Sequence, residues 1–307
     1  MKVEYFERRS SGERLEQVSR PRAGAWVHIY GVSLDAREVA QEFSLDADIV
    51  RDIADARELP RAEFKDGTEY IFIRLPVGAA DAAETAPLLI TLNMMRFMTI
   101  SVHADFSPLS TDVFLTTSTD RPSSLLPAVI ASGLVEYERR IRELADKITT
   151  ARKRLSRYEV ENADFVEFVA IEDSLNEYRS SLEGIANVVM QLQENRRKLF
   201  RVRDLEQFSD IAQHIRQLLV AIHSNTQTIT SIQNAYSTIA NNVLNQRMKL
   251  LTTITILLAI PNVFYGMYGM NLALPFQHEP WAYFGIIGMS MLLILLVYLL
   301  AKRFRLF

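Results

Sequence analysis

Two long runs of apolar residues near the C-terminus constrain the fold of this chain more than any other feature. The first is Leu250–Tyr268 and the second is Trp281–Leu300, and neither contains Asp, Glu, Lys, Arg or His. A helix needs about 20 mostly apolar residues to cross a bilayer core, and both runs have that length. Two core helices of a soluble protein are the alternative, but helices that are apolar on every face need a large surrounding core. The sequence therefore predicts membrane spans at about residues 250–269 and 281–300.

Basic residues lie only on the outer flanks of this pair of runs. The linker 271–280 contains no Lys or Arg. The flanking basic residues are Arg247, Lys249, Lys302, Arg303 and Arg305. Because positive flanks stay in the cytoplasm, the linker is expected to face outward. We therefore predict a multi-pass protein of the plasma (inner) membrane with both termini in the cytoplasm.

Residues 1–125 have the pattern of a compact α/β domain, which we expect to be cytoplasmic. Helical stretches around Val39 and Ile49 separate segments rich in β-branched and aromatic residues. We expect the segment Tyr70–Leu75 to end at Pro76 because proline interrupts strand pairing. The segments with strand composition are Trp26–Tyr30, Tyr70–Leu75, Leu88–Leu92 and Arg96–Val102. Strands with interleaved helices are typical of an α/β fold.

The pattern changes to long helices from Leu134 onward. Apolar residues recur there at spacings of three and four, break near Asn162, and restart at Phe168. We expect an antiparallel helical hairpin over residues 126–204. A third series begins at Phe208, and no Pro or Gly occurs from there to Ile260. The sequence thus predicts a cytoplasmic stalk helix over 205–249 that continues into a transmembrane domain, residues 250–307.

One face of this third helix carries small or uncharged polar side chains through the membrane. Its members include Asn245, Met248, Thr252, Thr255, Ala259, Asn262, Gly266 and Gly269. Polar groups against lipid are unfavourable, so the face should contact protein or water. A close helix–helix contact is one explanation, since membrane helices commonly pack through small residues. The other is a pore, which requires a homo-oligomer because two helices cannot enclose a channel.

Such a pore has the chemistry to pass a hydrated cation. The spans contain no Asp or Glu, so a bare divalent ion is not bound there by charge. Amide and hydroxyl oxygens accept hydrogen bonds from the water around an ion, and Mg²⁺ gives up that water reluctantly. A ring of amides from Asn271 is therefore a candidate entrance filter.

Composition argues against other classes of function. The chain has no cysteine, and it lacks a Gly-rich phosphate loop and a helical His-Glu pair, so we do not expect an enzyme. A net charge of −3 without a basic, aromatic-rich cluster gives no reason to expect nucleic acid as a partner. The expected partners are lipid, divalent cations and further copies of the chain.

The end of the first run resembles the CorA family of divalent-cation transporters. The residues that carry the resemblance are Tyr268-Gly269-Met270-Asn271, placed at the outer end of the first of two C-terminal spans. Three further stretches are similar to family sequence: Asn245–Thr252, Ile260-Pro261 and Ser209–His214. The chain departs from many relatives in having Asn262 after the proline and in the small side chain of Ala259.

The resemblance implies a funnel-shaped homopentamer with an α/β cytoplasmic domain, a helical stalk and a central pore. It implies passive Mg²⁺ influx that cytoplasmic Mg²⁺ shuts off, and it leaves open whether Co²⁺, Ni²⁺ or Zn²⁺ pass. Gly269, Met270 and Asn271 would form the selectivity filter. The conduit would be lined by Asn245, Met248, Leu251, Thr252, Thr255, Ala259, Asn262 and Gly266, with Leu251 as a hydrophobic constriction.

Acidic residues are candidates for regulation and for cation attraction. Asp210 matches a family position that senses intracellular Mg²⁺. Its partner on a neighbouring subunit would be Asp81 or Glu84, in the loop expected over residues 78–86. Glu279 in the outer linker is a candidate ring that attracts cations. A solvated surface acid is the alternative for each of these residues.

Two other functions compete with Mg²⁺ transport. The first is a ZntB-like zinc transporter, which shares the two-span architecture and the Gly-Met-Asn motif at the end of the first span. His214 and His223 lie on different helix faces and so offer no zinc pair. The second alternative is a membrane-anchored helical sensor without transport, which would leave the polar face and the Gly-Met-Asn turn without a role.

Overall fold

The computed structural model describes residues 1–7, 15–19, 24–31, 35–78, 84–102, 121–155, 162–270, 275–276 and 279–303. They divide into two compact units, Met1–Ile232 and Gln233–Phe307. One helix, α5 (Val202–Tyr268), contributes residues to both units.

The first unit is built on a seven-stranded sheet with the order β2-β1-β3-β7-β6-β5-β4. The strands are β1 (Lys2–Glu7), β2 (Glu16–Val18), β3 (Trp26–Tyr30), β4 (Arg61–Lys65), β5 (Thr68–Val77), β6 (Glu84–Leu92) and β7 (Phe97–Ser101). Neighbouring strands are antiparallel except β3 and β7, which pair in parallel. The sequence pattern did not predict β1, β2 or β4. β2 and β4 form the edges of the sheet, where charged and polar residues commonly replace a regular apolar alternation.

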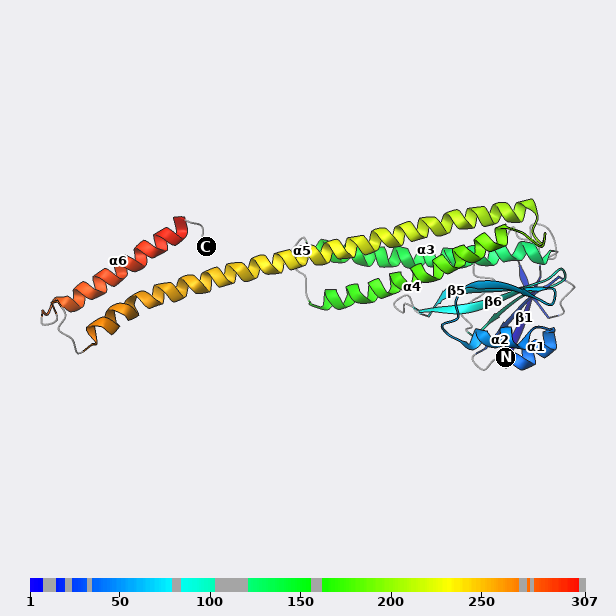
Figure 1. Cartoon of the computed structure of the whole chain (residues 1–307), viewed down its shortest axis with the longest axis horizontal. Coiled ribbons are helices and arrows are strands. Elements are labelled where there is room, and N and C mark those ends of the chain that lie inside the picture. The colour runs from blue at the N-terminus through cyan, green and yellow to red at the C-terminus, as the bar shows by residue number, and fades with distance from the viewer. Residues whose placement is uncertain are drawn as a thin grey trace. The chain divides into compact units, whose positions relative to one another are not determined.

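Helices cover both faces of the sheet. The covering elements are α1 (Ala36–Phe43), α2 (Ala47–Arg51), the short 3-10 turn η1 (Asp52–Ala54), α3 (Pro122–Leu155), α4 (Asn162–Gln193) and the N-terminal part of α5. Side chains alternate between the two faces along a strand. Ile71 and Ile73 of β5 therefore join the core beneath α3, α4 and α5, whereas Tyr70 and Phe72 join the core with α1 and α2 (Figure 1).

The helices form where apolar residues repeat at spacings of three and four. Tyr137 of α3 and Tyr178 of α4 are fully buried, with ring centroids 5.5 Å apart in an edge-to-face contact. α3 begins at Pro122, earlier than the Leu134 at which the helical pattern begins in the sequence. The additional turns are apolar, and Leu125 lies in the buried core between the sheet and the long helices.

Pro76 does not end its strand, so that expectation is wrong. β5 continues to Val77, with Pro76 opposite Thr85 of β6. β4 pairs with β5 only as far as Phe72 in the described register. Proline lacks the N–H that a central strand needs, and it is tolerated where one edge of a strand has no strand partner. The second half of β5 has such an edge, which depends on the short length of β4.

The second unit contains the remainder of α5 and the helix α6 (Ala282–Arg303). Within the described residues, these are the two helices that are long and apolar enough to cross a membrane. α5 continues through Pro261 to Tyr268. Proline cannot donate a hydrogen bond to the carbonyl of Leu257, four residues earlier. Such a break in the ladder is tolerated in membrane helices.

Candidate functional site

In the C-terminal part of α5, one side of the helix is less exposed than the rest. Its buried or half-buried residues are Thr253, Leu257, Ile260, Pro261, Phe264 and Tyr268. With 3.6 residues per turn, these positions fall on one side of the helix. α6 runs back alongside this part of α5 (Figure 1), and its own less exposed residues also form a single stripe. That stripe consists of Ala282, Ile286, Ile287, Ser290, Leu293, Ile294, Val297 and Ala301. We infer that α6 covers this side of α5.

The expected pore-lining residues lie on roughly the opposite side of α5. All of them are exposed in the single chain: Asn245, Met248, Leu251, Thr252, Thr255, Ala259, Asn262 and Gly266. Even the large apolar side chains of Met248 and Leu251 are 53% and 59% exposed. The polar face is therefore not the surface through which the two spans of one chain pack.

The hydroxyl groups near this face are oriented by the helix itself. Thr255 Oγ1 donates to the carbonyl oxygen of Leu251 at 2.9 Å, and Thr238 Oγ1 donates to that of Asn234 at 3.0 Å. A hydroxyl has one donor proton and two acceptor lone pairs. Once the proton is used on the backbone, the oxygen of Thr255 can only accept. Such an oxygen suits the water molecules around a cation.

The C-terminal end of α5 closes with a tight turn. The Gly269 N–H donates to the Tyr265 carbonyl at 3.0 Å, and the Met270 N–H donates to the Met267 carbonyl at 3.2 Å. A Cβ at Gly269 would lie 3.1 Å from the Tyr265 carbonyl oxygen, so a side chain there would be crowded. Asn271, the residue expected to act as the filter, lies outside the described residues.

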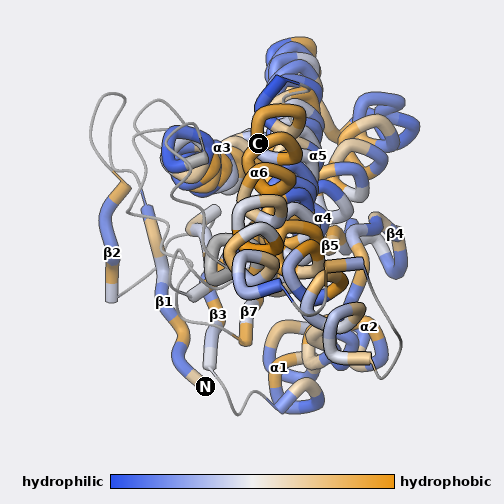
Figure 2. Tube along the Cα trace, turned by 90° about the vertical axis from the view of Figure 1, so that its left-hand side faces the viewer, coloured by the Kyte–Doolittle hydropathy of each residue, from blue (hydrophilic) through white to orange (hydrophobic). Residues whose placement is uncertain are grey.

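Colouring by hydropathy distinguishes α6 from the helices of the first unit, because orange dominates most of its length (Figure 2).

The turn that precedes α6 carries Glu279. Its N–H donates to the Phe276 carbonyl at 3.0 Å, and its own carbonyl accepts from the Ala282 N–H at 3.0 Å. The rings of Phe276 and Trp281 lie 5.2 Å apart across this turn. The backbone of Glu279 is thus fixed while the residue remains exposed.

The acids expected to regulate the protein are separated into different elements. Asp210 is exposed on α5, within the first unit. Glu84 is the first residue of β6 and pairs with Val77, so its expected position in a loop is wrong. β6 extends further than its apolar stretch indicated, and Asp81 lies outside the described residues. Among the residues that the structure describes, no three His, Asp or Glu side chains are grouped to hold a metal ion.

Neither histidine of the long helix is arranged to bind zinc together with the other. His214 Nε2 lies 3.3 Å from Glu138 Oε2 of α3, and His223 Nε2 lies 3.0 Å from Gln227 Nε2. Each ring therefore has its own partner, as expected from their positions on different faces of α5.

Two buried arginines of the first unit were not recognised from the sequence. Arg74 of β5 and Arg140 of α3 are 8% and 4% exposed. The sequence does contain a signal for Arg74, because it interrupts the apolar segment Tyr70–Leu75. A charged side chain in a fully buried strand needs dedicated hydrogen-bond partners.

The family is decided by a match along nearly the whole chain. Residues 22–303 match the family described as CorA-like Mg²⁺ transporter protein. The chain belongs to this family. The resemblance of the Gly269-Met270-Asn271 region is thereby confirmed as part of a match that includes the α/β unit, the long helices and both candidate spans.

Individual relatives agree with this assignment. The Cobalt/magnesium transport protein CorA of Methanocaldococcus jannaschii is 22% identical over 259 residues, which cover 81% of this chain and 80% of the relative. The complete structure of the CorA magnesium transporter from that organism matches with a TM-score of 0.83, at 17% identity, and the match covers 99% of this chain and 98% of that one. The ZntB cytoplasmic domain from Vibrio parahaemolyticus matches with a TM-score of 0.59 at 10% identity, covering 78% of this chain and 98% of that domain.

At these identities the structural matches show the fold alone. They confirm an α/β unit followed by a long helix and a C-terminal apolar helix. Family membership makes the chain a CorA-family divalent-cation transporter of the membrane. A helical sensor without transport is therefore disfavoured, and the expectation that the chain is not an enzyme agrees with a family of transporters.

Proposed function

We propose that this CorA-family protein is a passive Mg²⁺ channel of the plasma (inner) membrane. Five copies assemble into a funnel, and the polar faces of their α5 helices line a central pore. Mg²⁺ enters the cytoplasm down the membrane potential, and cytoplasmic Mg²⁺ closes the pore. Both termini are cytoplasmic in this arrangement, because the basic residues lie before the first span and after the second.

One observation carries this proposal: the exposed polar face of α5 lies opposite the side that α6 covers. In a membrane, a face with Asn262 and Thr255 requires water or protein rather than lipid. α6 cannot supply that contact, since it occupies the other side. Further copies of α5 around a shared axis satisfy the face, and a closed ring of identical subunits does so for every copy.

The residue types on this face suit a cation that retains its water. Gly269, Met270 and Asn271 form the filter at the outer end, where amide oxygens of Asn271 accept hydrogen bonds from the ion's water shell. Glu279 adds a ring of negative charge beside the entrance. Met248 and Leu251 form the narrow apolar stretch towards the cytoplasm, which closes by excluding water.

Regulation is assigned to Asp210 and to the acids at the start of β6. In the assembly, Asp210 of one subunit approaches Glu84 or Asp81 of its neighbour, and Mg²⁺ bridges them. Among the described residues of one chain, no three His, Asp or Glu side chains are grouped to hold a metal ion. The proposed site therefore takes its ligands from two subunits. Binding that favours the closed arrangement shifts the population towards it.

The transported ion is proposed to be Mg²⁺, with Co²⁺ as a second substrate, because the relative from M. jannaschii is named for both ions. Zn²⁺ is the alternative from a ZntB-like protein, and Ni²⁺ is a further candidate. The fold does not separate these ions. Asn262 and Ala259 lie on the proposed pathway and are the positions at which this chain differs from family sequence.

Flux into vesicles containing the full-length protein tests the proposal. Mg²⁺, Co²⁺, Ni²⁺ and Zn²⁺ are offered in parallel while internal Mg²⁺ is varied. We expect Mg²⁺ influx that falls as internal Mg²⁺ rises, and Asn271→Ala should abolish it while the pentamer still assembles. Ile254→Ala is the matched control, because Ile254 is exposed on α5 away from the polar face. Zn²⁺ flux without Mg²⁺ flux would instead identify a zinc transporter.

A further inference from the structure

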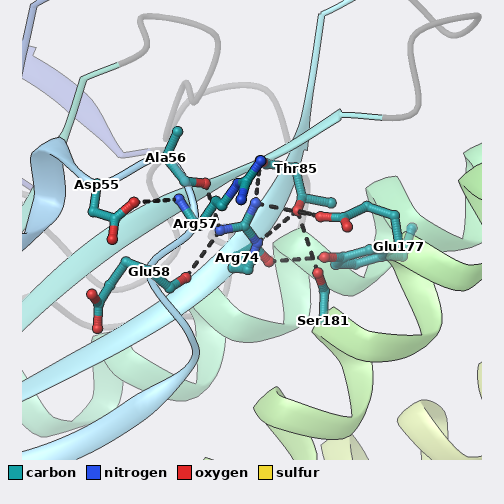
Figure 3. Close-up of polar contacts among 9 residues, drawn as sticks. Asp55, Ala56, Arg57, Glu58, Arg74, Thr85, Glu177 and Ser181 are labelled. Carbon is teal, nitrogen blue, oxygen red and sulfur yellow. Dashed lines mark hydrogen bonds and ion pairs between the residues drawn. The ribbon is translucent and has the colours of Figure 1, made fainter.

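Arg74 forms the centre of a buried polar network between the sheet and α4 (Figure 3). Its Nη1 donates to the carbonyl oxygens of Ala56 at 2.8 Å and Glu58 at 2.9 Å. Its Nε donates to Thr85 Oγ1 at 2.7 Å, and its Nη2 donates to the Thr85 carbonyl at 2.6 Å. Nη2 also lies 3.3 Å from Glu177 Oε1 of α4. One guanidinium thus joins the segment after η1, the start of β6 and α4.

Thr85 connects the same network to α4 in a second way. Its hydroxyl donates to the Glu177 carboxylate and lies 3.3 Å from Ser181 Oγ. Thr85 and Ser181 are buried, whereas Glu177 is partly exposed at the edge of the network. Because Glu177 is the carboxylate beside Arg74, it balances a charge that burial would otherwise make unfavourable.

Arg140 of α3 makes a similar set of contacts at the end of β5. Its Nη1 donates to the Val77 carbonyl at 3.2 Å, and its Nη2 donates to the Gly78 carbonyl at 2.8 Å. Its Nε donates to Glu136 Oε1 at 2.8 Å, which supplies the balancing charge. Val77 and Gly78 are the last described residues before the β5–β6 connection, and Glu84 and Thr85 are the first after it.

The two arginines therefore attach both ends of the β5–β6 connection to the helical hairpin. α3 holds its beginning through Arg140, and α4 holds its end through Glu177, Arg74 and Thr85. These contacts join residues that are distant in the sequence, since Arg74 and Glu177 are 103 positions apart. Glu84, one of the proposed regulatory acids, lies directly beside Thr85 in β6.

We propose that Arg140 and the Arg74–Glu177 pair are positioning residues for the regulatory acid Glu84, and that they set the internal Mg²⁺ concentration at which the pore closes. This inference rests on the proposed Mg²⁺-dependent closure. A carboxylate that is held in place loses little freedom when it binds an ion, whereas a loosely held one must first be ordered. Weakening either attachment lowers the affinity of the shared site without touching the pore.

Two variants and two matched controls test the inference in the full-length protein. Glu177→Gln removes the charge beside Arg74 but keeps a hydrogen-bond acceptor for Thr85. Arg140→Lys keeps the charge but loses the planar fork that binds Val77, Gly78 and Glu136 from three nitrogens. The controls are Glu183→Gln, an exposed acid on α4, and Arg142→Lys, whose side chain is 70% exposed on α3 and pairs only with Glu138 among the ion pairs of the described residues.

The readout is the internal Mg²⁺ concentration that halves influx into vesicles. We expect both variants to raise it about tenfold, as is typical when the partner of a metal ligand is removed. Maximal influx at low internal Mg²⁺ should stay at the wild-type level, which also shows that the variants fold and assemble. Hydrogen exchange should accelerate at Val77 and Thr85 in the variants and not in the controls.

The outcomes are distinguishable. If wild-type influx responds to internal Mg²⁺ and both variants close at the wild-type concentration, the positioning role is overturned while the proposed function stands. If wild-type influx does not respond at all, the proposed closure fails and this inference fails with it. Should Glu177→Gln not assemble, Ser181→Ala removes one weaker contact to Thr85 and should raise the half-closing concentration by a smaller factor.

Discussion

Glu69 of β5 is held by Arg197, which lies between α4 and α5: Arg197 Nη1 is 2.9 Å from Glu69 Oε1 and 2.8 Å from Oε2. Glu69 is 3% exposed, and burial raises the pKa of its carboxyl while Arg197 opposes that rise. The guanidinium of Arg197 also lies 4.1 Å from the ring centre of Phe64. The pair fastens the turn between the two long helices to the sheet.

Arg197→Met should therefore destabilise the first unit at neutral pH. Breaking a buried pair leaves an uncompensated charge, and we expect a loss of about 2 kcal/mol in unfolding free energy because Arg197 itself is partly exposed. In the variant the pKa of Glu69 rises further in the folded state, so the folded state binds a proton more tightly than the unfolded state. The loss should shrink as pH falls below neutrality. Denaturant unfolding from pH 7 to pH 5 measures this trend.

Arg196→Met is the control for that experiment, because Arg196 is exposed and pairs with Glu194 at 2.7 Å. Its effect should stay within about 0.5 kcal/mol at every pH. Equal losses in the two variants would contradict the assigned role of Arg197.

Two helical glycines allow close contacts with Leu75 of β5 and with Pro60, which precedes β4, and they predict different costs for alanine substitution. A Cβ at Gly184 of α4 would lie 2.7 Å from Cγ of Pro60, whereas one at Gly133 of α3 would lie 2.3 Å from Cδ2 of Leu75. The proline ring is rigid, but the end of a leucine side chain can rotate. We expect Gly184→Ala to lose about 1 kcal/mol more unfolding free energy than Gly133→Ala, within the usual cost of overpacking. Thermal unfolding of the two variants provides the comparison, and the reverse order would argue against these contacts.

Leu251→Ala should make the pore leak. If Leu251 forms the apolar constriction, a smaller side chain widens it and lets water and ions remain when internal Mg²⁺ is high. We expect residual influx under closing conditions, measured in the same vesicles. Leu250→Ala is the matched control, since Leu250 is also exposed on α5 but lies on the side of Thr253 and Leu257, away from the polar face. A leak from both variants would point to general loosening of the helix.

Glu279→Gln should slow influx mainly at low ionic strength. A ring of exposed carboxylates raises the local concentration of cations, and dissolved salt screens that attraction over about 10 Å at 0.1 M. We expect a reduction of roughly threefold at low salt, from the loss of electrostatic steering. The difference from wild type should disappear at high salt. An effect that persists unchanged at high salt would assign Glu279 a direct role in binding or in the fold of the turn.

Much of this architecture follows from patterns that are local in the sequence. The spacing that includes Tyr137 and Tyr178 predicts helices because it creates an apolar stripe wide enough to bury. The absence of charge from Trp281 to Leu300 predicts a membrane span because an apolar helix is buried by lipid as an apolar stripe is buried by a protein core. β3 follows from its β-branched and aromatic composition, and its observed bounds coincide with the predicted ones.

The remaining features depend on partners that are distant in the sequence. The strand continues through Pro76 only because β4 ends early on the neighbouring edge. The role of Arg74 depends on Glu177, which no local pattern connects to it. The polar face of α5 is visible in the sequence, but its position opposite the α6-covered side depends on how the two helices pack.

The sheet also sets a condition for biosynthesis. Its apolar surface around Ile73 and Ile90 is complete once the ribosome has finished β7, yet the helices that shield it come later in the chain. The nascent protein therefore exposes an apolar sheet face while α3 and α4 are still being synthesised. Newly exposed surface of this kind attracts chaperones or aggregates. Slowed translation between Ser101 and Gln193 should be more harmful to production of this protein than an equal delay near the membrane spans.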